Sequence, residues 1–65
     1  MDSEKIAKRL VALRGNESRE AVAKAIGVSV SALAMYENGA RIPRDETKRR
    51  IAEHYGRSVG EIFFE

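Results

Sequence analysis

Cysteine is absent from the chain of 65 residues, so neither a disulfide nor a thiolate metal site can stabilise it. A domain of this size buries only about 60% of the surface of its unfolded chain and often gains support from a partner. Close helix packing and a second subunit are the sources of stability that remain. The lack of cysteine is also compatible with a reducing, cytoplasmic location.

Long apolar runs are absent too, which excludes a membrane-spanning helix. The residues from Met1 to Arg9 are charged and contain no apolar signal core, so we expect no export signal. The single histidine, His54, has no second histidine or cysteine to share a metal ion with, and we interpret it as a surface residue of a helix. No nucleophile–base pair, carboxylate dyad or glycine-rich phosphate loop is present. We therefore expect no catalysis, no cofactor and no small-molecule ligand.

The composition that remains is that of a folded protein, with 43% hydrophobic and 34% charged residues. The formal net charge of +2 is a mild basic bias, which is compatible with nucleic acid as a partner. Strand alternation is missing, and the glycines and the single proline divide the sequence into short helical pieces. The fold class predicted is all-α, a compact five-helix arrangement in a single domain over residues 1–65.

The helix boundaries follow from capping residues. A first helix is predicted from Ser3 to Arg14, with Asp2 or Ser3 as its cap and a left-handed Gly15 as its stop. A second follows Ser18 and ends at Gly27, and a third follows Ser29 and ends at residues 38–39. A fourth is predicted over residues 45–55, with Gly56 as its stop. A last helix begins at Ser58, where Ser58 and Glu61 have the spacing of a capping box.

The second and third predicted helices are separated by only three residues, Gly27, Val28 and Ser29. Gly27 suits a turn that other residues adopt only at an energetic cost, and the small Ala23 lets the two helices approach. Apolar residues stand at the positions that such a pair buries: Val22, Ile26, Val28, Leu33 and Tyr36. This pattern over residues 19–38 is specific for a helix-turn-helix.

Here the sequence resembles the Cro/phage-repressor (XRE-type) family. Residues 18–29, SREAVAKAIGVS, resemble its SQEELAEKLGVS core, residues 36–39 match its YENG signature, and residues 41–43 resemble the R-x-P that follows. Residues 58–63 resemble the last helix, so the resemblance extends from Ile6 to Phe63. It implies a lambda-repressor-like five-helix domain, binding of double-stranded DNA through the third helix, and a homodimer on inverted repeats.

The resemblance also implies roles for individual residues. The N-terminus of the second helix is expected to bind a phosphate, since free N–H groups and the helix dipole favour an anion there. Arg14 and Glu37 are expected to form an internal ion pair. The expected phosphate contacts are Ser18, Arg19, Asn38, Arg41 and Arg44.

The outward positions of the third helix are unusual for a DNA-reading helix. The expected base contacts are Val30, Ser31, Ala34 and Met35. Among these only Ser31 can hydrogen-bond a base edge, so we predict readout through thymine methyl groups and DNA shape. The same apolar residues are also consistent with a buried core or with a surface that docks a protein.

Two further groups of residues carry predictions. Ile62, Phe63 and Phe64 are an apolar surplus near the end of the chain and are predicted as dimer contacts, with Phe63 also completing the core. The basic run of Lys48, Arg49 and Arg50 is interpreted mainly as a solvated helix face.

The function predicted from the sequence is a sequence-specific transcriptional regulator of a bacterial cytoplasm, most simply a repressor. The main alternative is a protein-interaction module, such as an antitoxin or an antirepressor, that uses the apolar third helix as its docking face. A second alternative is a nucleoid-type binder without sequence preference. Selection of bound sequences from random duplex DNA distinguishes the three.

Overall fold

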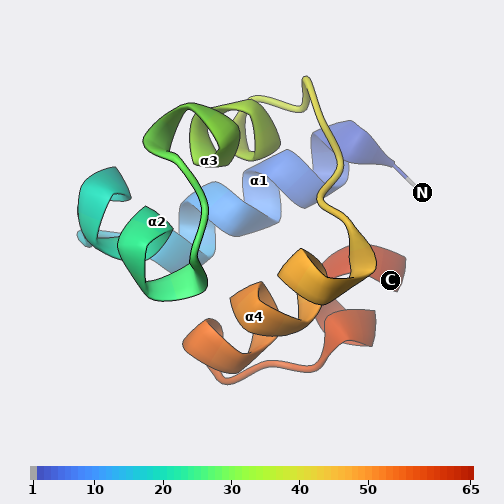
Figure 1. Ribbon diagram of the computed structural model, residues 1–65. Helices are drawn as coiled ribbons and strands as arrows, with labels where there is room; N and C mark the ends of the chain where they lie inside the picture. Colours follow the sequence, from blue (N-terminus) through green and yellow to red (C-terminus); the bar gives the residue numbers. More distant parts are fainter. Residues whose placement is uncertain (1) are drawn as a thin grey trace.

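The computed structural model describes residues 2–65, which form five helices and no strand (Figure 1). The predicted all-α fold class is confirmed. Helix α1 packs against α3 and the last helix, and α2 packs against α3 and α4. The helices are α1 (Ser3–Arg14), α2 (Arg19–Ile26), α3 (Val30–Glu37), α4 (Asp45–Tyr55) and the short η1 (Gly60–Phe64).

The starts of α1, α2 and α3 and the ends of α2 and α4 lie where the capping residues predicted them. Asp2, Ser18 and Ser29 each accept a hydrogen bond from a backbone N–H in the first turn of α1, α2 and α3. Gly27 and Gly56 close α2 and α4 in the left-handed conformation, with φ of 76° and 66°. The boundaries are therefore set by local chemistry.

Two details differ from the prediction. Gly15 ends α1 with a positive φ of 54°, but its ψ of −120° lies outside the left-handed helical region. The last helix is a π-helix over Gly60–Phe64 rather than a regular α-helix. The predicted capping box is present: the Glu61 N–H donates to Ser58 Oγ at 3.1 Å, and the Ser58 N–H donates to Glu61 Oε1 at 2.9 Å. The bond from the Ser58 N–H to the Glu61 carboxylate is the main reason why the pKa of Glu61 is lowered.

The hydrophobic core lies where α1, α2, α3 and α4 meet, and η1 closes it. Its largest fully buried side chains are Phe63, Leu10, Ile26, Leu33, Ile51, Ile62 and Val22. Leu13 and Val28 are only partly buried at its margin. Within the described residues, no helix is long and apolar enough to cross a membrane.

Lys48 corrects the interpretation of the basic run in α4. Its side chain is buried, whereas Arg49 and Arg50 are exposed as expected. The Lys48 ammonium lies 5.7 Å from the ring centre of Phe63 and 5.0 Å from that of Phe64. Its charge faces the π-systems of the two rings and lies 3.6 Å from Asp45 Oδ1, so the lysine packs as part of the α4–η1 contact.

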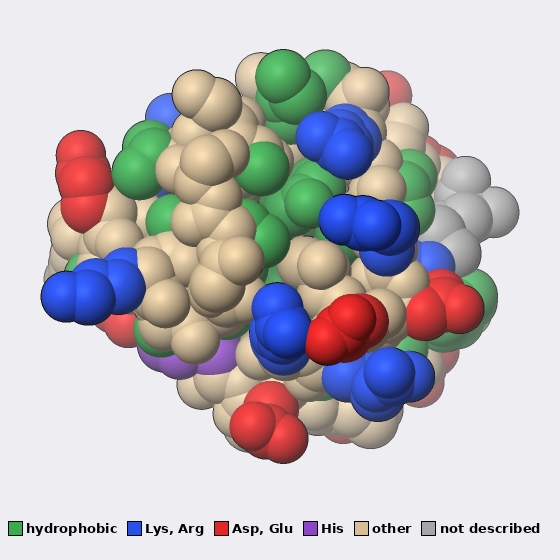
Figure 2. Space-filling view, in the orientation of Figure 1, with side chains coloured by type: hydrophobic (Ala, Val, Ile, Leu, Met, Phe, Trp, Pro, Cys, Tyr) green, Lys and Arg blue, Asp and Glu red, His purple; other side chains and the backbone are tan. Residues whose placement is uncertain are grey.

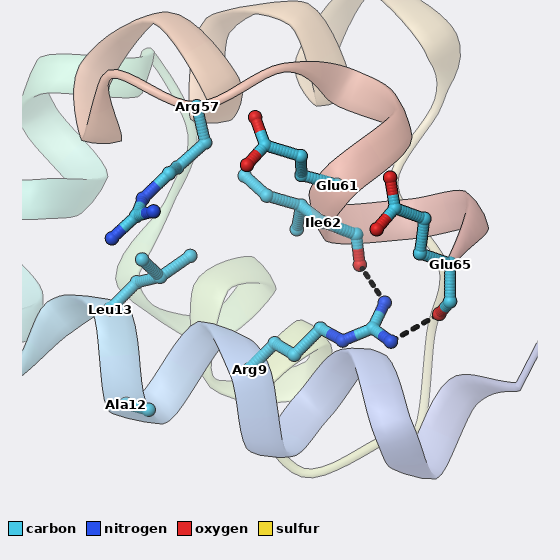
Figure 3. Close-up of a pocket in the computed structure, with 7 residues that line it drawn as sticks. All are labelled: Arg9, Ala12, Leu13, Arg57, Glu61, Ile62 and Glu65. Atoms are coloured by element: carbon cyan, nitrogen blue, oxygen red, sulfur yellow. Dashed lines mark hydrogen bonds between the residues drawn. The ribbon is translucent and has the colours of Figure 1, made fainter.

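The end of the chain is tied to α1 by Arg9 (Figure 3). Arg9 Nη1 donates to the carbonyl oxygen of Ile62 at 2.9 Å, and Nη2 donates to that of Glu65. Beside this contact lies a hollow of about 310 Å³ between α1 and η1, with Leu13 and Arg57 among its lining residues. The carbonyl groups at the end of η1 are thus satisfied by a side chain from the opposite end of the sequence.

Candidate nucleic-acid interface

Helix α3 buries one side and exposes the other. Leu33 and Tyr36 point into the core, whereas Val30 and Met35 are 41% and 42% exposed. Ser31 is exposed as well, and Ala34 is partly buried. Val30, Ser31 and Met35, which were predicted as base contacts, therefore lie at the outer surface of α3, and the alternative that the apolar residues form the core is excluded for Val30 and Met35.

The turn between α2 and α3 depends on a glycine at position 27. Gly27 has a φ of 76°, and a Cβ atom at this position would lie 3.2 Å from Nη1 of Arg50 on α4. The Val28 N–H donates to the carbonyl oxygen of Ala23 at 3.0 Å, which completes the turn. A side chain at position 27 would both strain the backbone and displace Arg50.

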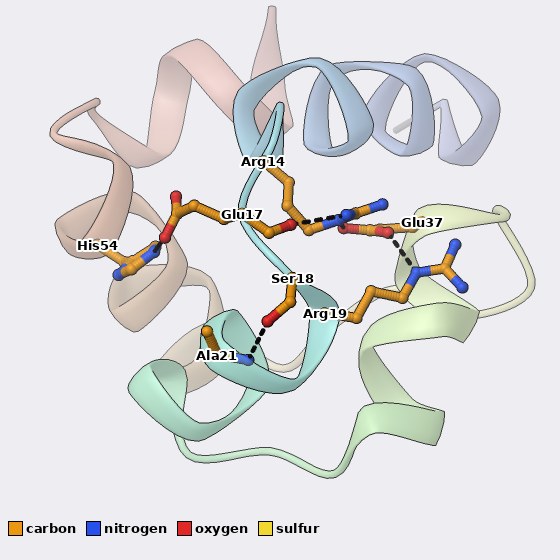
Figure 4. Close-up of polar contacts among 7 residues, drawn as sticks. All are labelled: Arg14, Glu17, Ser18, Arg19, Ala21, Glu37 and His54. Carbon is orange, nitrogen blue, oxygen red and sulfur yellow. Dashed lines mark hydrogen bonds and ion pairs between the residues drawn. The ribbon is translucent and has the colours of Figure 1, made fainter.

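One side of α3 carries an ionic cluster, which we call the Glu37 flank: Arg14, Ser18, Arg19 and Glu37 (Figure 4). Arg14 Nε donates to Glu37 Oε2 at 2.8 Å, and Arg19 Nε donates to Glu37 Oε1 at 2.9 Å. Ser18 Oγ accepts from the Ala21 N–H at 3.1 Å. The cluster joins α1, the start of α2 and the end of α3.

Glu37 is the centre of that flank. Its side chain is 0% exposed, and each carboxylate oxygen faces a guanidinium group. The hydrogen bond to Glu37 is the main reason why the pKa of Arg14 is raised. Glu37 therefore points inward and is paired, in keeping with a structural role for its carboxylate. The link from Arg19 to Glu37 was absent from the sequence-based interpretation, which gave Arg19 a phosphate contact only.

The other side of α3 carries exposed arginines, which we call the loop flank: Arg41, Arg44 and Arg50. They line a hollow of about 330 Å³ together with Ala32 and Tyr36 of α3. Figure 2 shows Lys and Arg side chains gathered over the segment after α3 and the start of α4. Within residues 2–65, neither Arg41 nor Arg44 has an ion-pair partner.

Arg50 is the member of the loop flank that sequence reasoning missed. Its Nη2 donates to Glu46 Oε1 at 2.7 Å, one helical turn earlier. The spacing of Glu46 and Arg50 is visible in the sequence and favours such a pair. Its position against Gly27, however, depends on how α4 packs on α2, which no local pattern reveals.

Asn38 lies at the end of α3, close to both flanks in sequence. Its side-chain oxygen accepts from the Ala40 N–H at 3.1 Å, so the carboxamide stabilises the turn that follows. The side chain is exposed, and its amide NH₂ faces away from that hydrogen bond.

The predicted dimer contacts divide into two groups. Ile62 and Phe63 are each 2% exposed because they fill the core beneath η1, which leaves them little surface for a second subunit. Phe64 is 62% exposed, although its ring also meets the Lys48 ammonium. Of the three predicted dimer contacts, Phe64 is therefore the one that lies at the surface.

His54 and Tyr55 lie on α4 behind the Glu37 flank. His54 Nε2 is 3.3 Å from Glu17 Oε1, so the histidine is partly buried against the loop before α2 rather than free on the surface. Within residues 2–65, no group of His, Asp and Glu side chains could hold a metal ion.

The helix-turn-helix consists of α2 and α3, and cationic side chains lie on both sides of α3. This arrangement is typical of DNA-binding proteins. A family model described as "Helix-turn-helix" matches residues 7–62, so the chain belongs to this family of Cro/phage-repressor (XRE-like) type, whose members are DNA-binding regulators. Comparison with curated proteins and with solved structures gave no match.

Proposed function

We propose that the protein is a repressor that binds inverted-repeat operator DNA as a homodimer, with α3 of each subunit in the major groove. The observation that carries this proposal is the arrangement around α3. Glu37 pairs with Arg19 on one side of the helix, while Ala32 and Tyr36 line the hollow of Arg41 and Arg44 on the other. The major groove admits a helix and is bordered by phosphates on both edges, which matches this arrangement.

On this proposal the two flanks position the protein and the outer face of α3 reads the sequence. The proposed phosphate contacts are Ser18, Arg19, Asn38, Arg41 and Arg44. The proposed base contacts are Val30, Ser31, Ala34 and Met35. Three of these four are apolar, so contact with thymine methyl groups and the shape of the site supply most of the specificity, together with one hydroxyl from Ser31.

The second subunit is proposed to cover Phe64, which is the most exposed large apolar side chain of the described residues. The site of action would be the bacterial cytoplasm, with the protein bound to the nucleoid. Sedimentation of the wild type and of Phe64→Ala tests the dimer. The variant should have a larger dimer dissociation constant than the wild type, while its unfolding temperature stays similar. A wild type that stays monomeric at high concentration contradicts the dimer.

Selection of bound sequences from random duplex DNA tests the function. A palindromic consensus is expected, and it should contain thymine at the steps that α3 contacts. Replacing those thymines by uracil removes only the methyl groups and should weaken binding, and Met35→Ala should lose affinity at the same positions. Uracil-substituted DNA that binds as well as thymine DNA would remove the base-reading role of Met35.

The exposure of Val30 and Met35 also supports a second candidate, a protein-interaction module whose α3 docks another protein, such as an antitoxin or an antirepressor. Bound DNA without any enriched sequence favours a nucleoid-type binder. Absence of DNA binding, with loss of a protein partner in Met35→Ala, favours the docking module.

A further inference from the structure

Arg19 begins α2 at the point where a helix N-terminus offers free N–H groups to an anion. Its side chain is 44% exposed, yet its Nε is held 2.9 Å from a carboxylate that is 0% exposed. One end of the guanidinium is therefore fixed by the protein interior while the other end faces solvent. Such an arrangement limits the directions in which the remaining N–H groups can point.

A guanidinium has five N–H donors, and Nε supplies one of them. In Figure 4 the two Nη groups of Arg19 lie on the side away from Glu37. Arg14, by contrast, uses Nε on Glu37 and Nη1 on the carbonyl oxygen of Glu17 at 2.9 Å, so its donors are directed into the protein. Of the two arginines on Glu37, Arg19 is the one whose Nη groups make no hydrogen bond within residues 2–65.

The charges of the cluster favour an anion. Two arginines share one buried carboxylate, which leaves one positive charge in excess. Glu20 is the exposed carboxylate next to Arg19, in the first turn of α2. Glu17 lies against His54 on the other side of the loop. Glu37 itself is covered by protein and cannot meet an incoming phosphate.

We propose that Glu37 is a positioning residue for binding of the DNA backbone: it holds Nε of Arg19 so that the two Nη groups face the phosphate at the N-terminus of α2. The inference rests on the proposed function and deepens it, because it assigns one phosphate contact to a pre-set arginine. A rotamer-rich side chain that is already ordered loses less entropy when it binds.

The proposal predicts an effect with an unusual sign. Removing a negative charge from a protein that binds a polyanion should strengthen binding if only net charge counts. If Glu37 positions Arg19, Glu37→Gln should instead weaken binding, because the guanidinium loses its fixed direction. Arg19→Lys should likewise lose the contact although it keeps the charge, since an ammonium cannot hold Glu37 and present a planar pair of donors at the same time.

The test uses a fluorescent mixed-sequence DNA duplex, since contacts to phosphate do not require the operator. Binding of wild type, Arg19→Gln, Arg19→Lys, Glu37→Gln and the Arg19→Gln/Glu37→Gln double variant is measured by anisotropy over a range of salt concentrations. Circular dichroism monitors folding of each variant. Arg57→Gln is the control, because it removes the same charge from the hollow between α1 and η1.

Each of the three single variants at positions 19 and 37 should reduce the steepness of the plot of log affinity against log salt concentration by about 0.9. A slope of 0.9 corresponds to a change in affinity of about 3-fold between 50 and 200 mM salt. The double variant should bind no more weakly than Arg19→Gln, and Arg57→Gln should keep the wild-type slope. A folded Glu37→Gln that binds as tightly as wild type, or losses that add in the double variant, would overturn the proposal.

Arg19→Lys decides the question even if Glu37→Gln does not fold, because position 19 is exposed at a helix start. Lysine that binds like wild type shows that charge alone is used and refutes the positioning role. A wild type that does not bind the duplex at any salt concentration refutes the proposed function as well. Wild-type binding with an unaffected Arg19→Lys refutes only the present inference.

Discussion

The two flanks of α3 are built in opposite ways. On the Glu37 flank, a buried carboxylate joins Arg14 and Arg19 from two other elements. On the loop flank, Arg41 and Arg44 are exposed, and Arg50 alone is paired, with the exposed Glu46. The same residue type is thus ordered by the interior on one side and left to solvent on the other.

The two kinds of arginine contribute differently to the binding of a polyanion. An arginine that is fixed before binding holds the neighbouring helix in a defined orientation on the DNA. Fixing it requires a buried carboxylate, and such a buried charge must be fully paired. Exposed arginines cost nothing to keep and can follow the backbone of the DNA, but they lose up to about 2 kcal/mol of side-chain freedom on binding. The Glu37 flank should therefore set orientation, and the loop flank should add attraction.

The largest expected effect compares the two carboxylates. Glu37→Ala should lower the free energy of unfolding by about 3 kcal/mol, because it removes the buried carboxylate that pairs Arg14 and Arg19 and leaves a cavity in its place. Glu46→Ala removes a similar pair from the surface and should cost about 0.5 kcal/mol or less. Urea denaturation of both variants provides the measurement. Equal losses would show that the two flanks are not built differently.

A second prediction compares two glycines that share a backbone conformation. Gly27→Ala and Gly56→Ala should each lose about 1–2 kcal/mol of stability, since both positions have a positive φ. Only at position 27 would the new Cβ atom meet Arg50, whereas nothing lies within 4 Å of it at position 56. Thermal unfolding measures the common loss. DNA binding should weaken further in Gly27→Ala alone, and identical DNA affinities would argue against a role for Arg50.

Much of the fold could be predicted because its signals are local. The caps at Asp2, Ser18 and Ser29 and the stops at Gly27 and Gly56 are single residues whose chemistry decides where a helix begins or ends. The reciprocal bonds of Ser58 and Glu61 were predictable for the same reason.

The errors concern contacts between elements that are distant in sequence. Arg19 and Glu37 are paired although 18 positions separate them, and no local pattern predicts that contact. Lys48 was misread because its charge suggested a solvated face. Its spacing of three and four residues from Ile51 and Ala52, which are both buried, was the signal that could have placed it inside. Phe63 completes the core, as the sequence suggested, and Ile62 lies beside it.

A third prediction concerns additivity in DNA binding. Arg41→Gln and Arg44→Gln should each lower the salt slope by about 0.9, and the losses should add, because neither side chain depends on the other. Additive behaviour here would contrast with the non-additive pair of Arg19 and Glu37. The salt dependence of binding to the mixed-sequence duplex measures both. A double variant no weaker than either single one would show that the loop flank also acts as a unit.

The smallest effect concerns alkaline pH at the inner end of the Glu37 flank. Burial raises the pKa of Tyr55 to about 12, with further contributions from Glu37 and Glu17, and its hydroxyl has no hydrogen-bond partner within residues 2–65. The folded state therefore holds the phenolic proton more tightly than the unfolded chain, whose tyrosine has a pKa of about 10. The stability that this provides is complete below pH 10 and is lost as the pH rises towards 12. Tyr55→Phe has no proton to lose, so its unfolding temperature should fall less steeply than that of the wild type between pH 10 and 12. Parallel curves would show that Tyr55 ionises alike in the folded and unfolded chain. Burial next to the Glu37 flank would then have no effect on the phenol of Tyr55 on α4.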